Sequence, residues 1–290
     1  MKMTDVTIIG LGSMGLTMAE LMLGAGRSVT LWNRSADKAT DLVARGAHFA
    51  PSPAAAIAAS PVILICVFDY TAAQAILDAD GAAAALDGRL LVNLGTGSPE
   101  DARDAEIFVA GHGGRYLDGA IQAAPSQMGQ DDTPILVSGA ATVFAEALPL
   151  LRVLAGSPMH LGERIDAAAF MDLATLSYVY GAFGGFLHGA RIAESVDISV
   201  ATFGRIVEQI SPTFGAFFKH EAAVIESGDF AITESPLRIS IPAVERILRT
   251  SEALGINTEL PALVHEWLGR ADRAGLANEE LASLIKILRG

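Results

Sequence analysis

Two groups of residues in this sequence have types and spacings that could do chemistry. The first is a glycine-rich run that follows a short apolar segment and opens an apolar-periodic helix: Gly10, Leu11, Gly12, Ser13, Met14 and Gly15. In that context the first glycine allows a tight turn, the second lets the backbone approach a pyrophosphate, and the third lets helix and strand pack closely. The phosphates then lie at the positive end of the helix. The run predicts dinucleotide binding, the alternative being a glycine turn without a ligand.

The end of the second apolar run indicates which dinucleotide is bound. An enzyme that binds NAD normally has Asp or Glu here for the ribose 2′-hydroxyl. This chain instead has Asn33, Arg34 and Ser35, with Lys38 one helical turn later. Asn33 and Ser35 can donate hydrogen bonds to a 2′-phosphate, and Arg34 adds a permanent planar charge. The pattern predicts NADP(H) as the cofactor, with a solvated basic loop as the alternative.

Later strand ends complete the predicted cofactor site. Val67 and Phe68 end one apolar run, and Thr96 follows the next. The carboxyl ends of parallel strands meet at one edge of a sheet, where such ligands bind. We therefore expect these three residues to border the adenosine and the nicotinamide.

The second group lies on one long apolar helix, where Asp172, Leu176 and Tyr180 follow one another at intervals of four residues. This spacing gives a slowly drifting stripe whose ends are roughly 12 Å apart along the axis. A buried Asp in an apolar helix is costly unless it is paired or functional, so Asp172 is a candidate acid or cation stabiliser. The alternatives are a structural pair with an arginine for Asp172 and core packing for Tyr180.

Other candidate chemistries find little support. His188 continues the same stripe near the helix end and is interpreted as a structural histidine. No metal-ligand spacing links the histidines with the single cysteine, Cys66, so no metal is expected. No Gly-x-Ser-x-Gly elbow indicates an acyl enzyme.

Composition excludes several classes of protein. The 290 residues suggest two domains, and 51% hydrophobic against 18% charged residues predicts a large buried core. A net charge of −13 argues against nucleic acid and anionic membranes as partners. The apolar segment 167–187 is interpreted as a buried helix and not a membrane span, because Asp172 lies within it. A lone cysteine and no visible export signal favour the cytoplasm.

The elements that must position these residues alternate along the first half of the chain. Short apolar, β-branched-rich runs occur at residues 7–10, 29–32, 62–67, 90–93 and 134–137. Stretches with helical spacing separate them, and Ser52 and Ser98, each followed by proline, mark helix starts. The alternation predicts an α/β fold with a mostly parallel sheet and crossover helices.

Strand-like runs end near the turn signals of residues 156–158. Residues 163–290 then predict successive helices interrupted by four prolines: Pro212, Pro236, Pro242 and Pro261. The first helix, about 163–193, is apolar nearly all round, and we interpret it as the link between the domains and as part of a dimer interface. Domain boundaries of 1–160 and 161–290 follow.

Taken together, the motifs resemble the β-hydroxyacid dehydrogenase superfamily and, within it, the NADPH-dependent imine reductases and reductive aminases. The resemblance covers the whole chain and rests on residues 10–15, 32–35, 93–99 and 118–125 and on Asp172 with Tyr180. It implies an N-terminal Rossmann domain of doubly wound parallel sheet, a long interdomain helix and an all-helical C-terminal domain exchanged within a homodimer. It also implies catalytic roles for Asp172 and Tyr180. The aminase subgroup has Asn where this chain has Thr96.

Lysine positions separate the branches of that superfamily. The only lysines are Lys2, Lys38, Lys219 and Lys286, so the long helix has none, whereas the hydroxyacid dehydrogenases use one there. Their Ser-Gly-Gly carboxylate cradle is replaced by residues 122–125. A cationic iminium needs no lysine, and a carboxylate can stabilise it. We expect reduction of a cyclic imine, or of a ketone with an amine; the alternatives are an NADP-dependent β-hydroxyacid or aldehyde reductase and a non-catalytic NADP-binding sensor.

Overall fold

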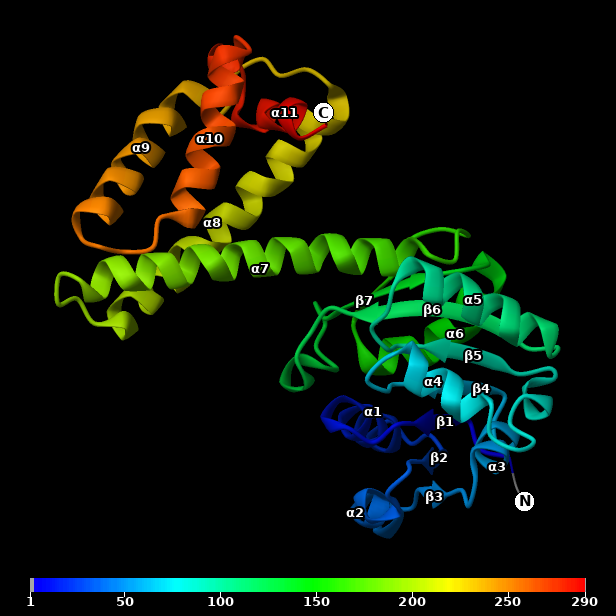
Figure 1. The fold of residues 1–290 in the computed structure, drawn as a ribbon. Coiled ribbons are helices and arrows are strands. Elements are labelled where there is room, and N and C mark those ends of the chain that lie inside the picture. Colours follow the sequence, from blue (N-terminus) through cyan, green and yellow to red (C-terminus); the bar gives the residue numbers. More distant parts are fainter. Residues whose placement is uncertain (1–2, 290) are drawn as a thin grey trace. The chain divides into compact units, whose positions relative to one another are not determined.

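The structure, a computed structural model, describes residues 3–289 and divides into two compact units, Met1–Leu176 and Ser177–Gly290 (Figure 1). The division falls inside α7 (Ala167–Glu194), which is one of the two longest helices among the described residues. Among the described residues, no helix is both long and apolar enough to cross a bilayer.

The first unit is built on a sheet that has eight strands within the described residues, in the order β3-β2-β1-β4-β5-β6-β7-β8. All neighbours are parallel except β6 and β7, which are antiparallel. The strands are β1 (Val6–Ile9), β2 (Val29–Trp32), β3 (His48–Phe49), β4 (Val62–Ile65), β5 (Leu90–Asn93), β6 (Arg115–Ile121), β7 (Pro134–Ser138) and β8 (Ser157–His160). Strand order reverses between β1 and β4, the point at which doubly wound sheets bind ligands. The predicted Rossmann-type sheet is confirmed.

Side chains alternate between two buried faces of this sheet. Ile8 and Leu64 join the core cluster that includes Met18 of α1, whereas Ile9 and Ile65 join the opposite cluster. Burial on both faces explains why the strands read as continuous apolar runs. The helices of this unit are α1 (Ser13–Gly24), α2 (Thr40–Ala44), α3 (Pro53–Ala58), α4 (Tyr70–Leu77), α5 (Pro99–Gly111) and α6 (Ala141–Leu154), with short 3₁₀ turns η1 (Ala36–Ala39), η2 (Ala84–Leu86) and η3 (Pro125–Gln127).

Both predicted helix starts are confirmed. Ser52 accepts a hydrogen bond from the backbone N–H of Ala55 at the start of α3. Ser98 and Asp101 form a reciprocal capping box at the start of α5. These caps satisfy donors that the first helical turn leaves without partners.

The expectation that strands end before residues 156–158 is wrong. Ser157 pairs with Pro134, and Pro158 with Ile135, to make β8 the parallel edge strand beside β7. A proline is tolerated on an edge strand because its missing N–H faces no neighbour there. Turn chemistry was thus outweighed by pairing with β7.

The second unit is helical, as predicted. It contains the rest of α7, together with α8 (Val200–Ser227), α9 (Leu237–Ala253), α10 (Glu259–Arg273), α11 (Ile285–Leu288) and the 3₁₀ turns η4 (Leu276–Asn278) and η5 (Leu281–Leu284). Leu237 and Leu268 lie in the core cluster that joins α9 to α10.

Two of the four expected proline breaks are wrong. Pro212 lies inside α8 and Pro242 inside α9, and both helices continue past them. Pro236 is the N-cap of α9, and Pro261 lies in the first turn of α10, where its missing N–H costs nothing. Burial of an apolar face along a long helix outweighs the cost of one interior proline, about 3 kcal/mol.

Candidate active site

A cavity of about 920 Å³ lies at the carboxyl ends of β1, β2 and β4, beside the switch point of the sheet. It brings together nearly all the residues predicted to bind the cofactor: Gly10, Leu11, Gly12, Ser13, Met14, Gly15, Asn33, Arg34, Ser35, Lys38, Val67 and Phe68. Its size suits a dinucleotide, since ligand sites in proteins commonly measure about 300–1,000 Å³.

The three glycines of the first motif have different reasons for lacking a side chain. A Cβ on Gly10, whose φ is +99°, would lie 2.2 Å from the carbonyl oxygen of Cys66. A Cβ on Gly15 would lie 1.9 Å from the carbonyl oxygen of Gly10. A Cβ on Gly12 would meet no protein atom within 4 Å. Gly10 and Gly15 therefore serve chain packing, whereas the bare backbone at Gly12 leaves room for a ligand.

The start of α1 fits an anionic group at this place. Gly12 is the N-cap of α1, so no side chain caps the helix, and its first turn contains no acidic residue. The first backbone N–H groups of a helix lack partners within it and attract anions. The residues present thus fit the pyrophosphate of a dinucleotide.

Asn33 lines the cavity and also makes contacts within the protein. Its Oδ1 accepts a hydrogen bond from the Leu11 backbone N–H at 3.0 Å, and its Nδ2 donates to the Ser35 carbonyl oxygen at 3.0 Å. The amide therefore joins the end of β2 to the glycine loop. Arg34 and Lys38 are exposed, and within the described residues neither forms an ion pair, so their charges are available to a phosphate.

A smaller cavity of about 200 Å³ adjoins the first and shares Met14, Cys66 and Val67 with it. It also contains Thr96 and Asp172, one predicted from a strand end and one from the long helix. The structure thereby places the candidate carboxylate beside the cofactor cavity. Burial raises the pKa of the Cys66 thiol to about 11, so this sulfur is not a thiolate nucleophile at neutral pH.

Asp172 is buried, with 7% of its surface exposed, and its partner is an amide. Gln122 Nε2 donates to Asp172 Oδ1 at 2.6 Å. The alternative of a structural pair with an arginine is wrong, because none of the ion pairs among the described residues includes Asp172. Asp172 is therefore a buried carboxylate without a neutralising ion pair among the described residues.

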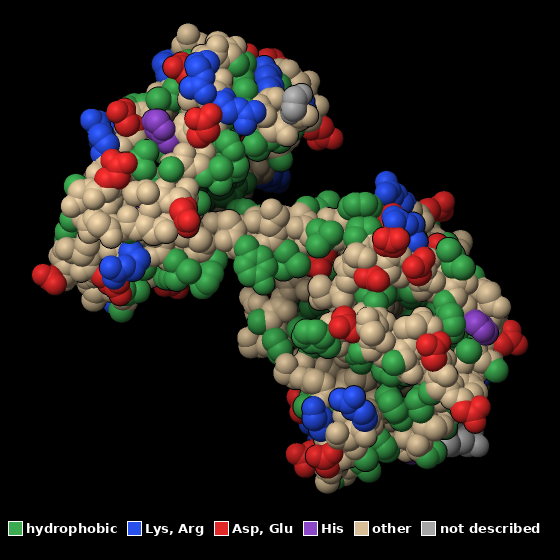
Figure 2. All heavy atoms as spheres, in the orientation of Figure 1, with side chains coloured by type: hydrophobic (Ala, Val, Ile, Leu, Met, Phe, Trp, Pro, Cys, Tyr) green, Lys and Arg blue, Asp and Glu red, His purple; other side chains and the backbone are tan. Residues whose placement is uncertain are grey.

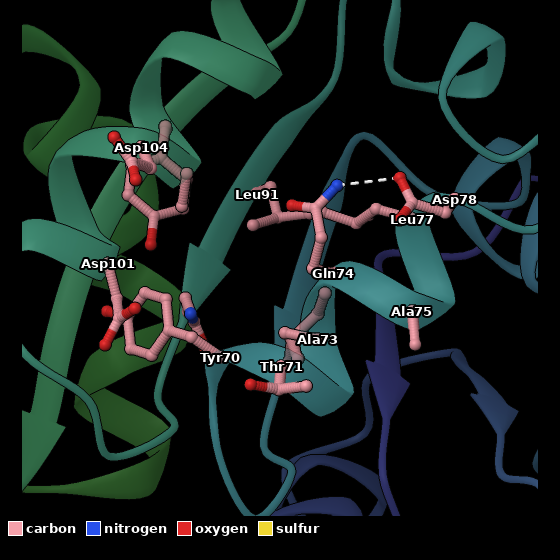
Figure 3. Close-up of a pocket in the computed structure, with 14 residues that line it drawn as sticks. Tyr70, Thr71, Ala73, Gln74, Ala75, Leu77, Asp78, Leu91, Asp101 and Asp104 are labelled. Atoms are coloured by element: carbon pink, nitrogen blue, oxygen red, sulfur yellow. Dashed lines mark hydrogen bonds between the residues drawn. The ribbon is translucent and has the colours of Figure 1, made fainter.

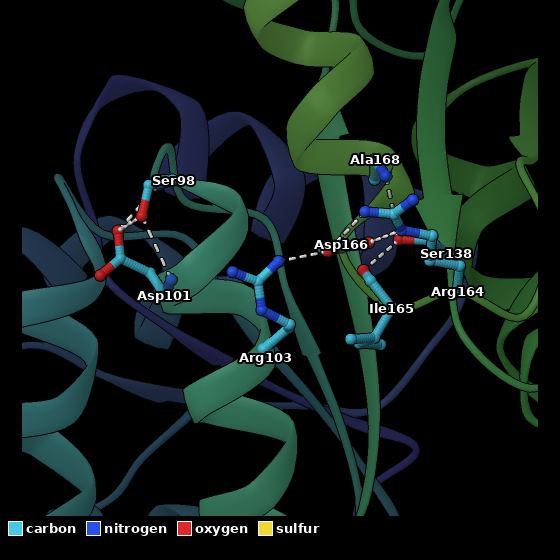
Figure 4. Close-up of polar contacts among 8 residues, drawn as sticks. All are labelled: Ser98, Asp101, Arg103, Ser138, Arg164, Ile165, Asp166 and Ala168. Atoms are coloured by element: carbon cyan, nitrogen blue, oxygen red, sulfur yellow. Dashed lines mark hydrogen bonds and ion pairs between the residues drawn. The ribbon is translucent and has the colours of Figure 1, made fainter.

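The start of α7 is fixed to the sheet by polar contacts (Figure 4). Asp166 lies between the guanidinium groups of Arg103 on α5 and Arg164, and hydrogen bonding to Arg164 lowers the pKa of its carboxyl group. Ser138, at the end of β7, accepts a hydrogen bond from the Ala168 backbone N–H at 3.1 Å. These contacts hold the helix turn that precedes Asp172.

Sequence reasoning missed a second buried carboxylate, Asp118, in the middle of β6. Tyr70 donates a short hydrogen bond to its Oδ1, and Tyr116 donates another at 3.3 Å. Burial, and to a smaller extent the charge of Asp172, raise the pKa of Asp118 to about 7, although hydrogen bonds from the two tyrosine hydroxyls lower it. The signal that could have identified it is an aspartate inside the otherwise mostly apolar stretch of residues 116–121.

The two tyrosines also line a third cavity, of about 420 Å³ (Figure 3). Figure 3 shows side chains of α4 on one side of it and Asp101 and Asp104 of α5 on the other. Tyr70 and Tyr116 thus connect the buried Asp118 carboxyl group to the wall of this cavity.

The remaining candidates lie in the second unit. Tyr180 is 70% exposed there, and the described contacts give it no hydrogen-bond partner. His188 Nε2 lies 3.2 Å from the Ser251 hydroxyl, in agreement with its structural interpretation.

One group of potential metal ligands occurs among the described residues: His220, Glu221 and Glu280, whose ligand atoms lie within 4.8 Å of one another. Glu280 is fully buried, and its oxygens accept the backbone N–H groups of residues 233–235 at 2.5–3.0 Å. Those hydrogens carry positive partial charge and would repel a cation at the same oxygens. The cluster connects α8 to the C-terminal segment.

Comparison with known proteins agrees with this architecture. Residues 5–162 match the family described as the NAD binding domain of 6-phosphogluconate dehydrogenase, and residues 165–290 match the NADPH-dependent reductive aminase-like C-terminal domain. The chain is 30% identical over 288 residues to an NADPH-dependent reductive aminase of Aspergillus oryzae (strain ATCC 42149 / RIB 40), covering 98% of this chain and 97% of that protein.

Solved structures give the same result. A reductive aminase from Aspergillus terreus in complex with NADPH and ethyl-5-oxohexanoate is 34% identical and superposes with a TM-score of 0.90, covering 99% of this chain and 100% of that one. An imine reductase from Myxococcus stipitatus in complex with NADP⁺ is 29% identical, with a TM-score of 0.90 and coverage of 98% and 99%.

The fold, the dinucleotide cavity and these matches define an NADPH-dependent oxidoreductase that acts on carbon–nitrogen double bonds. In particular, the chain belongs to the family of reductive aminases and imine reductases. The resemblance seen in the sequence is thereby confirmed.

Proposed function

We propose that this protein is an NADPH-dependent imine reductase that reduces the C=N carbon of a cyclic imine to give an amine. One observation carries the proposal: a buried carboxylate, Asp172, lies in the small cavity that adjoins the glycine loop, on a helix without lysine. When bound, NADPH supplies the hydride.

The cofactor is held by this chain's own loops. The backbone around Gly12 and the first turn of α1 bind the pyrophosphate. The 2′-phosphate is bound by Asn33, Arg34, Ser35 and Lys38. Val67, Phe68 and Thr96 border the adenosine and nicotinamide. The shared cavity lining of these residues supports the assignment.

Asp172 stabilises the positive charge of the iminium or gives a proton to its nitrogen. Such a carboxylate acts strongly because it is buried and water is largely excluded from it, so charges interact more strongly than in bulk solvent. Tyr180 orients the substrate, a role that rests on the family resemblance. Thr96 lines the same cavity as Asp172, where it contacts the substrate.

Use of a ketone and an amine as substrates is a further part of the proposal. A related reductive aminase from Aspergillus terreus has been solved with cyclohexanone and allyl amine. The chain differs from that subgroup at Thr96, so we expect the preformed cyclic imine to be the better substrate.

The protein is a homodimer in which the helical units are exchanged, and it acts in the cytoplasm. Figure 2 shows hydrophobic side chains at the surface along α7. Many large apolar side chains of α7 and α8 are at least 44% exposed: Tyr178, Val179, Phe183, Leu187, Ile206, Ile210, Phe214 and Phe218. Phe218 contacts both Tyr178 and Phe214, so part of this exposed apolar surface is contiguous, as expected of an interface. Light scattering after size exclusion tests the dimer, and a monomer at micromolar concentration would contradict it.

The test of the function is the loss of NADPH absorbance with three substrates: a simple cyclic imine, a β-keto acid, and a ketone mixed with an amine. Each is repeated with NADH. Turnover of the imine with NADPH supports the proposal. Turnover of the keto acid alone indicates a hydroxyacid reductase, and tight NADPH binding without any turnover indicates the sensor.

A further inference from the structure

We infer that Gln122 and Thr175 are positioning residues that hold the Asp172 carboxyl group in one place in both its ionised and its protonated form. The inference rests on the proposed function, because it concerns the group that faces the iminium. It gives a role in the reaction to Gln122, the partner of Asp172, and to Thr175.

Three side chains form a continuous chain of hydrogen bonds. Thr175 Oγ1 donates to Gln122 Oε1 at 2.7 Å, and Gln122 Nε2 donates to Asp172 Oδ1 at 2.6 Å. Thr175 Oγ1 also lies 2.9 Å from the Asp172 carbonyl oxygen. Asp172 and Thr175 are three residues apart on α7 and therefore lie on one helix face. The chain of bonds connects that face to the residue that follows β6.

The backbone of Gln122 is itself held by the sheet. Its N–H donates to the Pro134 carbonyl oxygen at 3.2 Å, which continues the antiparallel ladder between β6 and β7. The sheet thus fixes Gln122, and Gln122 fixes Asp172. Asp172 Oδ2 accepts no hydrogen bond from the described residues, and Asp172 lines the small cavity. This second oxygen is the one available to a substrate.

The observed arrangement is the one that an ionised carboxylate requires. A carboxylate only accepts hydrogen bonds, so the amide must present its N–H groups to Asp172 and its oxygen to Thr175. A hydroxyl group both donates and accepts, so Thr175 can supply the hydrogen that Oε1 needs.

Protonation of Asp172 on Oδ2, the oxygen available to a substrate, leaves the chain of hydrogen bonds unchanged. Oδ1 is then the carbonyl oxygen of the acid and still accepts from Gln122 Nε2, and Thr175 still donates to Gln122 Oε1. The Gln122 amide therefore keeps both partners in either state, which avoids the cost of a buried unsatisfied group, about 1–3 kcal/mol.

A chain of hydrogen bonds that holds both forms of Asp172 matches the proton balance of the reaction. Reduction of a neutral imine adds a hydride to carbon and a proton to nitrogen. When Asp172 gives that proton, its O–H bond breaks as the N–H bond forms, and solvent restores the proton afterwards. The carboxyl group therefore changes charge in each turnover while Gln122 and Thr175 keep its position.

The test compares Gln122→Leu and Gln122→Glu with Thr175→Val and Thr175→Ser in the full-length protein. For each variant, kcat and KM with one cyclic imine are measured from pH 5 to pH 9, together with NADPH affinity and Tm. We expect Gln122→Leu to lower kcat by about 10- to 100-fold, the effect of a misplaced reacting group, with little change in NADPH affinity.

The other variants separate positioning from simple packing. Thr175→Ser keeps the hydroxyl and retains activity, whereas the nearly isosteric Thr175→Val loses about 10-fold in kcat, the effect of one lost hydrogen bond. An ionised glutamate cannot donate to an ionised Asp172, so kcat of Gln122→Glu falls with rising pH while kcat of Gln122→Leu is low throughout. Unchanged kcat in Gln122→Leu, or equal losses in both Thr175 variants, overturns the inference.

A second readout does not depend on turnover. The side-chain amide NMR signals of Gln122, assigned by their loss in Gln122→Leu, shift during a pH titration of the wild-type protein but not of Asp172→Asn. If the Gln122 amide signals of the wild type do not change with pH, the inference is overturned. If the wild type reduces no imine, the proposed function fails, and this titration still decides whether the amide follows the charge of Asp172.

Discussion

The side-chain oxygen of Asn33 accepts a hydrogen bond from the backbone N–H of Leu11 at 3.0 Å, so a single amide joins the end of β2 to the glycine loop after β1. This position follows the strand whose end usually carries the ribose-binding carboxylate. The oxygen that would meet a ribose hydroxyl is turned into the protein, and the charges of Arg34 and Lys38 remain outward.

Two substitutions at Asn33 are expected to have different effects on the cofactors. Asn33→Ala removes the hydrogen bond to the Leu11 backbone N–H. It therefore weakens the binding of NADPH and NADH alike, by about fivefold for the loss of one hydrogen bond. Asn33→Asp keeps an acceptor for Leu11 but adds a negative charge, so it weakens NADPH more than NADH. Titration of each variant with both cofactors checks this, and equal losses in Asn33→Asp would contradict it.

The glycines of the loop separate folding from binding. Gly12→Ala is expected to leave Tm nearly unchanged, because the new methyl group meets no protein atom, while NADPH binding falls by more than about 10-fold. Gly15→Ala is expected to lower Tm by several degrees, because its Cβ would overlap the Gly10 carbonyl oxygen. Thermal melts with and without NADPH measure both effects. Normal NADPH affinity in Gly12→Ala would refute the assignment of the Gly12 backbone to pyrophosphate binding.

Arg34 is expected to select the phosphorylated cofactor. Arg34→Ala removes a charge-assisted contact with the 2′-phosphate and weakens NADPH by about 10- to 100-fold, with little effect on NADH. Arg249→Ala, which removes an exposed arginine of α9, is the matched control. Equal weakening of both cofactors by Arg34→Ala would exclude the assignment.

Asp172 is expected to be essential for turnover but not for cofactor binding. Asp172→Asn keeps the size of the side chain but removes the charge and the proton, so kcat with a cyclic imine falls by at least about 100-fold. NADPH affinity, measured by fluorescence titration, stays near that of the wild type. Undiminished kcat would remove Asp172 from the mechanism.

Asp118 is expected to make stability depend on pH. Burial raises its pKa from 3.8 to about 7 in the folded protein, so the folded state binds this proton more tightly than the unfolded state does. Its contribution is fully present below about pH 4 and is lost as pH rises to about 7, a difference of about 4 kcal/mol.

The measurement is Tm from pH 4 to pH 8 for the wild type and Asp118→Asn. The variant lacks the titrating group, so its Tm falls less over this interval, with Asp104→Asn as a surface control. Parallel curves for the wild type and Asp118→Asn would show that Asp118 titrates normally.

The sheet and the cofactor loops could be predicted because their signals are local. The runs at residues 29–32 and 90–93 coincide with β2 and β5, and the glycine spacing identified the turn after β1. Contacts between distant residues were not predictable in this way. The partner of Asp172 is an amide 50 residues earlier in the chain, and nothing in the helix sequence indicates it.

Two strands that the sequence did not predict, β8 and β6, were missed for the same reason. Ser157 and Pro158 have the composition of a turn, yet pairing with β7 makes them a strand. Asp118 and Gly119 have low strand propensity, yet β6 runs through them between β5 and β7. In both places hydrogen bonds to a neighbouring strand outweigh local preference, and a single sequence does not state which strands will be neighbours.

The hydrogen bonds that hold Asp172 all come from within Met1–Leu176, the unit that also contains the glycine loop. The carboxylate and the cofactor cavity therefore lie on one continuous segment of the chain. Recombination between relatives with a junction after Leu176 therefore transfers the carboxylate and the cofactor cavity together. Residues beyond the junction, Tyr180 among them, can then be exchanged to change how the substrate is oriented while the hydrogen bonds that hold Asp172 stay the same.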